Sequence, residues 1–141
     1  AVVIGQPEPQ PLPTDTALLA AMPQDGERWS LIDLPLWPDW ERRPLRTIDP
    51  HRGKPSQTRW RSLGYDAATD SSRVELEPLT GRTHQLRVHL AALGHPILGD
   101  ALYANTAQQA RAARLLLHAQ WLAFEHPGTG QWVEFTLPTP F

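Results

Sequence analysis

The sequence predicts an α+β fold, in which a mixed, mostly antiparallel sheet is combined with a few helices. Three observations support this prediction. Two strand patterns at 57–63 and 73–79 are joined by a short polar connection, which is typical of an antiparallel hairpin. A second pair, at 121–125 and 132–137, flanks a turn that contains proline and glycine. Between the two pairs, leucines recur at helical spacing over 83–93.

Length and composition indicate one domain, or a large part of one. A chain of 141 residues that is 40% hydrophobic can bury a single core. No apolar run approaches the roughly 18 to 20 residues of a membrane span, and the N-terminus lacks a signal-like segment. We therefore expect no membrane association and a cytoplasmic location. The absence of cysteine excludes disulfides and thiolate metal sites.

Charge is segregated along the chain, although the net charge is only −2. Residues 1–41 hold seven acidic residues against Arg28 alone, whereas 42–87 hold ten of the thirteen basic residues against five acidic ones. A locally basic surface attracts a polyanion even on an acidic protein. The alternative interpretation is an ordinary solvated surface of mixed charge.

In the first third of the chain, prolines separate short strand patterns. Residues 1–5 predict part of a strand, and 6–29 form a proline-rich insertion or loop in which 16–22 predict one or two helical turns. The pattern at 30–36 predicts another strand. The proline- and glycine-rich stretch 37–55 predicts a loop, so its arginines should be accessible.

Two helices are predicted in the second half. The first covers 83–93, with Thr83 as its N-terminal cap, Gly94 at its end and one leucine-bearing face in the core. The second runs from about 107 to 114, with Thr106 as its cap.

The densest polar cluster, residues 80–89, passes from a strand end through a glycine turn into a helix N-terminus. Such a junction suits anion binding, and Arg82 adds a positive charge. Arg87 lies at the edge of the buried helix face, where a guanidinium can hold a carboxylate through two hydrogen bonds and keep it ionised. The alternative for Arg87 is a purely structural salt bridge.

Other candidate residues favour structural roles. His84 and His89 lie about 140° apart on a helix and cannot form an i, i+4 metal pair, so we expect no metal site and predict hydrogen-bonded structural histidines. Asp100 follows a glycine, which favours an N-terminal cap over a catalytic acid. Trp37, Trp40 and Trp60 could stack on unpaired bases, although Trp60, which lies in a predicted strand, is equally suited to core packing.

Several motifs follow one another in the second half of the chain. They are Leu79-Thr80-Gly81-Arg82-Thr83-His84-Gln85-Leu86-Arg87-Val88-His89-Leu90, Gly94-His95-Pro96-Ile97-Leu98-Gly99-Asp100 with Tyr103, and Leu116-Leu117-His118-Ala119. Together they resemble the C-terminal signatures of RluA-family pseudouridine synthases. Two earlier motifs, in 32–36 and 53–58, also match, so the resemblance covers roughly 30–141.

The resemblance implies part of a pseudouridine synthase catalytic domain, of which 1–5 are the tail of a central strand. It implies isomerisation of uridine to pseudouridine in ribosomal or transfer RNA, with no cofactor. In the family, an aspartate of a His-Arg-Leu-Asp motif attacks the flipped-out uridine. That motif is absent here, and we expect it, with an active-site tyrosine, to lie upstream of Ala1. We therefore expect this chain to be inactive alone.

The resemblance also suggests site residues. Arg87 corresponds to the arginine that pairs with the catalytic aspartate, and Leu117 to an apolar wall of the uracil pocket. We expect the protein to be a monomer and further side chains to contact RNA, namely Arg82, His84, Gln85, Arg42, Arg43, Arg46, Arg52 and Lys54. Two rivals stay open: a stand-alone RNA-binding module without catalysis, and an unrelated hydrolase that uses Asp100 and His84.

Overall fold

The computed structural model describes residues 1–9 and 28–141. The predicted helical turn at 16–22 and most of the 6–29 segment lie outside the described residues. The elements in chain order are β1 (Val2–Ile4), β2 (Ser30–Asp33), β3 (Leu36–Pro38), β4 (Arg46–Ile48), β5 (Gln57–Asp66), β6 (Ser71–Pro78), α2 (Gln85–Ala92), α3 (Thr106–Gln109), β7 (Trp121–Glu125) and β8 (Trp132–Thr136).

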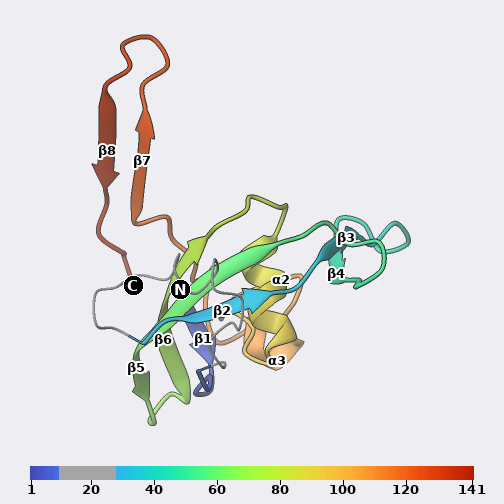
Figure 1. The fold of residues 1–141 in the computed structure, drawn as a ribbon. Coiled ribbons are helices and arrows are strands. Elements are labelled where there is room, and N and C mark those ends of the chain that lie inside the picture. The colour runs from blue at the N-terminus through green and yellow to red at the C-terminus, as the bar shows by residue number, and fades with distance from the viewer. Residues whose placement is uncertain (10–27) are drawn as a thin grey trace.

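A four-stranded sheet in the order β1-β6-β5-β2 forms the body of the described structure, and its neighbouring strands are antiparallel (Figure 1). The predicted hairpin is confirmed in β5 and β6, where Trp60 lies opposite Leu76. β1 is held on both sides, because its other edge bonds to the segment around Ile97 and to the carbonyl of Leu116. The α+β prediction is confirmed.

The core lies between this sheet and α2, with the segment after α2 closing it. Its buried members come from six different parts of the chain: Val3, Ile32, Trp60, Val74, Leu90 and Ile97. Alternation along β6 turns Val74 inward and the neighbouring Arg73 and Glu75 outward. The burial of these side chains fixes the helix that carries the polar cluster against the sheet.

Helix α2 begins later than predicted, and Thr83 is not its cap. His84 holds the N-cap position with φ 59°, a left-handed conformation, and makes no side-chain capping bond. The leucine-bearing face that was expected in the core includes Leu86, which is only half-buried; the buried face consists of Gln85, Val88, His89 and Leu90. The amide of Gln85 turns inward to bond the preceding loop, which leaves Leu86 facing outward.

The region predicted as one strand and one long loop, 30–55, is more ordered than expected. The strand is interrupted at Leu34 and Pro35, and a short β3–β4 hairpin follows. Gly53 permits the tight turn after β4, because a Cβ there would lie 2.3 Å from the carbonyl oxygen of Asp49. We call residues 36–48 the arm. It extends away from the sheet beyond β2 (Figure 1).

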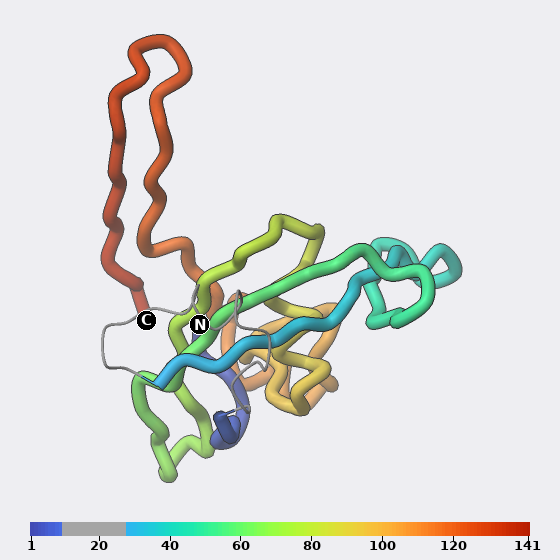
Figure 2. The backbone as a smooth tube through the Cα atoms, viewed as in Figure 1, coloured from blue at the N-terminus to red at the C-terminus, as the bar shows by residue number. Residues whose placement is uncertain are grey.

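The closing hairpin was predicted correctly, whereas the last helix is shorter than predicted. α3 has four residues, and its cap is Asn105, whose side chain and that of Gln108 form a reciprocal capping box. The predicted end at 114 was therefore wrong. β7 and β8 pair as predicted and project from the body as a separate two-stranded hairpin (Figure 2).

The helices in the described part of the chain are too short or too polar to cross a membrane.

Candidate functional site

The loop between β6 and α2 is built around the side chain of Gln85. Its amide oxygen accepts hydrogen bonds from the Thr80 hydroxyl at 2.8 Å and the Arg82 backbone N–H at 3.0 Å. Its amide nitrogen donates to the Gln57 carbonyl at 2.9 Å and the Thr58 hydroxyl at 3.1 Å. Because these four bonds use the full capacity of the amide, Gln85 anchors the loop to β5 and has no polar group left for RNA.

Arg87 and Asp100 form a bidentate ion pair at the edge of α2. The Nε and Nη2 groups of Arg87 donate to the two carboxylate oxygens of Asp100 at 2.8 and 2.6 Å. Asp100 is fully buried, and its Oδ1 also accepts the backbone N–H groups of Leu102 and Tyr103. The capping prediction for Asp100 is thus confirmed, and the carboxylate that Arg87 holds in this chain is Asp100.

Tyr103 connects this ion pair to the arm. Its hydroxyl accepts the backbone N–H of Arg46 in β4 at 2.9 Å and is hydrogen-bonded to Nδ1 of His84 at 2.8 Å. The Arg87 guanidinium carbon lies 5.2 Å from the centre of the Tyr103 ring, a favourable cation–π distance. One tyrosine therefore contacts β4, the start of α2 and the arginine.

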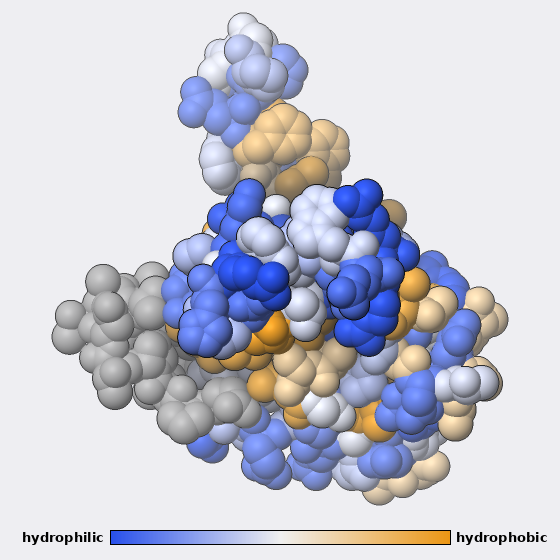
Figure 3. Space-filling view, turned by 90° about the vertical axis from the view of Figure 1, so that its right-hand side faces the viewer, coloured by the Kyte–Doolittle hydropathy of each residue, from blue (hydrophilic) through white to orange (hydrophobic). Residues whose placement is uncertain are grey.

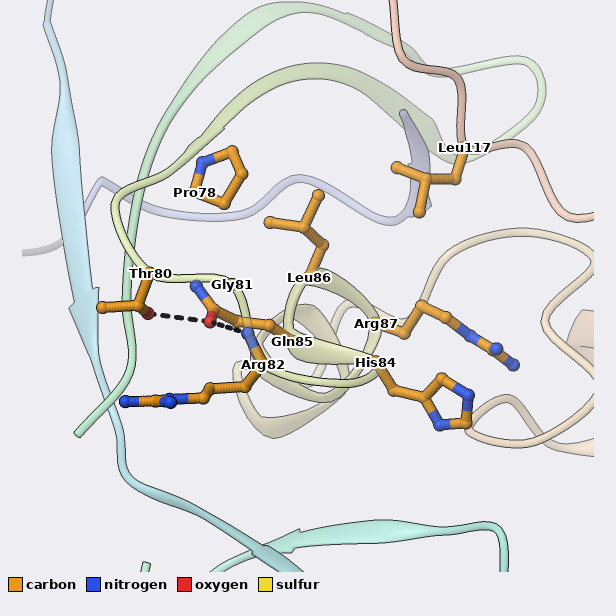
Figure 4. Close-up of a pocket in the computed structure, with 9 residues that line it drawn as sticks. All are labelled: Pro78, Thr80, Gly81, Arg82, His84, Gln85, Leu86, Arg87 and Leu117. Carbon is orange, nitrogen blue, oxygen red and sulfur yellow. Dashed lines mark hydrogen bonds between the residues drawn. The ribbon is translucent and has the colours of Figure 1, made fainter. Parts of the chain in front are cut away.

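A pocket of about 350 Å³ opens beside this network (Figure 4). Its lining residues come from the end of β6, the following loop, α2 and the segment before β7: Pro78, Thr80, Gly81, Arg82, His84, Gln85, Leu86, Arg87 and Leu117. Leu86 and Leu117 face the same opening from different parts of the chain, whereas the Arg82 side chain extends away from Arg87. The pocket thus combines apolar walls with a fixed cation.

Burial and charge shift the titration of the groups around Arg87. Burial raises the pKa of the Asp100 carboxyl, but hydrogen bonds from Arg87 and the backbone outweigh it and bring that pKa below its usual value. The hydrogen bond to Asp100 raises the pKa of Arg87. Burial, and then the charges of Arg87 and Arg46, lower the pKa of His84. At neutral pH the pair is therefore ionised and His84 is neutral.

The other predicted RNA-binding arginines lie apart from the pocket. Arg42 and Arg52 are exposed, but each forms an ion pair, at 2.7 Å, with the aspartate three residues before it, which reduces the positive charge of the region. Arg46 is joined to Tyr103 through its backbone N–H, and its side chain bonds the carbonyls of Pro44 and Leu45. Arg43 and Lys54 are exposed.

Two of the histidines, His89 and His95, are hydrogen-bonded structural residues, as predicted. His89 is fully buried between the Thr58 hydroxyl and the Leu34 carbonyl, at 2.9 Å from each. His95 bonds the Ile4 carbonyl. Over residues 1–9 and 28–141, no group of three or more histidines and carboxylates is arranged to hold a metal ion. The hydrolase alternative also loses support, because Asp100 is enclosed and its oxygens are engaged.

Sequence reasoning missed the roles of Tyr103 and Gly99. Tyr103 belonged to a quoted motif, but nothing in a local pattern indicates that its hydroxyl would reach β4, 57 residues earlier. Gly99 has φ 75°, and a Cβ there would lie 2.0 Å from the carbonyl oxygen of Arg114. The sequence did offer one signal for this role. Gly99 stands just before Asp100, and glycine allows another backbone segment to approach closely.

Comparison with known proteins gives a consistent family assignment. The family described as RNA pseudouridylate synthase matches residues 17–92. Dual-specificity RNA pseudouridine synthase RluA of Escherichia coli strain K12 is 50% identical over 111 residues, which are 79% of this chain and 50% of that protein. The protein of the same name from Pasteurella multocida is 49% identical over 110 residues, 78% of this chain and 50% of that protein. This chain thus spans about half the length of these relatives.

Solved structures agree. Human RNA Pseudouridylate Synthase Domain Containing 1 superimposes with a TM-score of 0.72 at 33% identity, over 100% of this chain and 53% of that one. Human RNA Pseudouridylate Synthase Domain Containing 4 has the same fold, with a TM-score of 0.66 at 22% identity, over 99% of this chain and 56% of that one. The chain belongs to the RNA pseudouridylate synthase family, and within it is of the RluA type.

Proposed function

We propose that the intact protein isomerises uridine to pseudouridine in ribosomal or transfer RNA and that this chain supplies the arginine side of its active site. By intact protein we mean this chain together with the half of the relatives' length that it does not cover. The observation that carries the proposal is the Arg87 guanidinium, fixed by Asp100 at the rim of an apolar-walled pocket.

The pocket suits a flat base that has left the RNA stack. Leu86 and Leu117 can cover the faces of uracil, and Arg87 supplies a charge at the rim. In the reaction, the bond from the ribose to N1 of uracil breaks, the base turns, and C5 bonds to the ribose. C5 releases its hydrogen as a proton and N1 takes up a proton, so the product is an isomer of the substrate.

Arg87 is suited to pair with a second carboxylate. Two of its nitrogens already donate to Asp100, whereas Nη1 has no hydrogen-bond partner among the described residues. We propose that Nη1 meets the catalytic aspartate of the intact protein and keeps it ionised, as the family resemblance suggests. Leu117 is proposed as the apolar wall of the uracil site.

Tritium release from RNA labelled at C5 of uridine tests this proposal. The 141-residue chain should release no tritium above a no-enzyme control, because it lacks the nucleophile, whereas the intact protein should release it. Release by the 141-residue chain would disprove its expected inactivity. No release by the intact protein on either ribosomal or transfer RNA would disprove the proposed reaction.

Arg87→Ala in the intact protein tests the role of the arginine. We expect most activity to be lost while RNA affinity is retained, because Arg87 is assigned to the aspartate and not to the phosphates. Arg61→Ala is the matched control, since Arg61 pairs with Glu75 on the sheet at 2.7 Å and does not line the pocket. Equal turnover by the two variants would contradict the assignment.

A stand-alone RNA-binding module is the second candidate, and the exposed Arg43 and Lys54 support it. In that case the 141-residue chain would bind RNA with an affinity that falls steeply with salt. The monomeric state and the cytoplasmic location stay predictions.

A further inference from the structure

The tip of the arm carries an exposed aromatic side chain beside a cation. Trp40 is 58% exposed, in the turn between β3 and β4. The guanidinium carbon of Arg43 lies 4.2 Å from the centre of the Trp40 ring, well within the range of a cation–π contact. A lone exposed tryptophan needs no explanation, but one stacked with an arginine presents both a flat apolar surface and a positive charge.

Arg43 and the neighbouring Arg42 make different contacts. The side chain of Arg42 is engaged by Asp39, with Nε to Oδ2 at 2.8 Å, and the same aspartate caps the turn. Arg43 has no carboxylate partner among the described residues, and its recorded contact is the Trp40 ring. Arg43 is therefore the cation next to the exposed indole, while the exposed Glu41 adds a negative charge to the same turn.

The arm is fixed to the pocket at its base. The backbone N–H of Arg46 donates to Tyr103, whose hydroxyl also bonds His84 at the pocket wall. At the tip, the backbone N–H of Asp39 donates to the carbonyl of Leu45, which closes the turn. Figure 3 faces this side of the molecule, where strongly hydrophilic residues lie in the upper part of the near surface and hydrophobic ones lie below them.

We propose that Trp40 and Arg43 form a binding site for one unpaired base of the RNA and its adjoining phosphate, outside the catalytic pocket. The base stacks on the part of the indole that Arg43 leaves uncovered, and the guanidinium pairs with the phosphate. Stacking accepts any base, because every base has a π-face. The site therefore favours single-stranded over duplex RNA. This inference rests on the proposed function in taking RNA as the ligand.

Fluorescence anisotropy on the intact protein, with a labelled single-stranded RNA of twelve nucleotides and the duplex of the same sequence, tests the site. Trp40→Ala should weaken binding of the single strand about tenfold, whereas Trp40→Phe should keep most of the affinity. Arg43→Ala should weaken binding and make the slope of log K against log salt shallower by about one phosphate contact. Arg43→Lys should keep that slope.

Trp132→Ala is the matched control. Trp132 is 64% exposed, close to the value for Trp40, but its indole N–H donates to Glu134, so its surroundings are acidic. This variant should bind RNA as the wild type does. If the RNA affinity of Trp40→Ala is also within twofold of the wild type, the proposed site does not exist. The same result is expected if Trp40 binds a protein partner instead of RNA.

Turnover separates this inference from the proposed function. Trp40→Ala should raise KM and leave kcat unchanged at saturating RNA, because Trp40 does not line the pocket. Normal KM and kcat in this variant would refute the stacking site and leave the synthase proposal intact. Weakened RNA binding by Trp40→Ala, in an intact protein that forms no pseudouridine, would refute the synthase proposal and support the stacking site.

Discussion

Replacing Asp100 with asparagine should destabilise the chain strongly, because it removes the charge that holds Arg87. Asparagine fits the same space, and its oxygen can still accept the backbone N–H groups of Leu102 and Tyr103. Its NH₂ group, however, takes the place of one carboxylate oxygen and faces an N–H donor of the guanidinium. The Arg87 side chain is only 16% exposed, so water cannot fully replace the lost partner.

The size of the loss follows from these contacts. Removing one partner of a buried ion pair costs about 3–5 kcal/mol, and the partial exposure of Arg87 favours the lower end, about 3 kcal/mol. In a chain of this length such a loss lowers Tm by about 10 °C. Urea unfolding followed by tryptophan fluorescence measures the free energy directly. Asp39→Asn, which breaks the exposed pair with Arg42, is the control and should change stability little.

The pH dependence of the stability loss tests whether the charge of Asp100 causes it. The folded-state pKa of Asp100 lies below its ordinary value of 3.8, so its contribution is fully present above that value and is lost as the pH falls through the folded pKa. The difference in the free energy of unfolding between wild type and Asp100→Asn should therefore be constant from about pH 7 to about pH 5, and it should become smaller below pH 5. A gap under about 0.5 kcal/mol at pH 7, within ordinary surface effects, would refute the reasoning.

Three further predictions concern the surroundings of this pair. Gly99→Ala should lower the free energy of unfolding by more than about 2 kcal/mol in urea, because the new Cβ meets a backbone oxygen at 2.0 Å, whereas Gly81→Ala, with open space around it, should cost far less. Tyr103→Phe should cost about 1–2 kcal/mol in the same assay, because the hydroxyl of this half-buried residue joins two elements; no change would show that the link is dispensable. The NMR titration midpoint of His84 should lie below 6.5, and a midpoint above it would contradict the effect of burial and the nearby arginines.

Local patterns in the sequence were enough to predict the hairpins and the existence of the central helix. The β5–β6 and β7–β8 pairs follow from alternation and turn residues, which act over a few positions. Where α2 begins could not be predicted, because the start depends on the Gln85 amide bonding to β5. The same holds for the β3–β4 hairpin, whose composition is typical of a loop but which is held by Tyr103.

In the candidate site, too, local features could be predicted and long-range contacts could not. Arg87 was predicted to hold a carboxylate, and helical geometry alone placed it at the edge of the buried face. Which carboxylate it holds could not be derived, because Asp100 is brought to it by the close approach of Gly99 to Arg114, a long-range packing feature. Gln85 looked like a polar candidate for RNA, yet the loop uses its whole side chain.

The arrangement around Asp100 bears on why this chain should be inactive alone. One buried carboxylate orients Arg87 and also bonds the backbone of the turn that carries Tyr103, whose hydroxyl holds β4. The arginine is therefore fixed before any second carboxylate arrives, and the entropy of ordering its long side chain is already lost on folding. The proposed arginine side of the active site should therefore form in this chain by itself. If the chain releases no tritium, we expect the cause to be the absence of the proposed nucleophile and not a collapsed site.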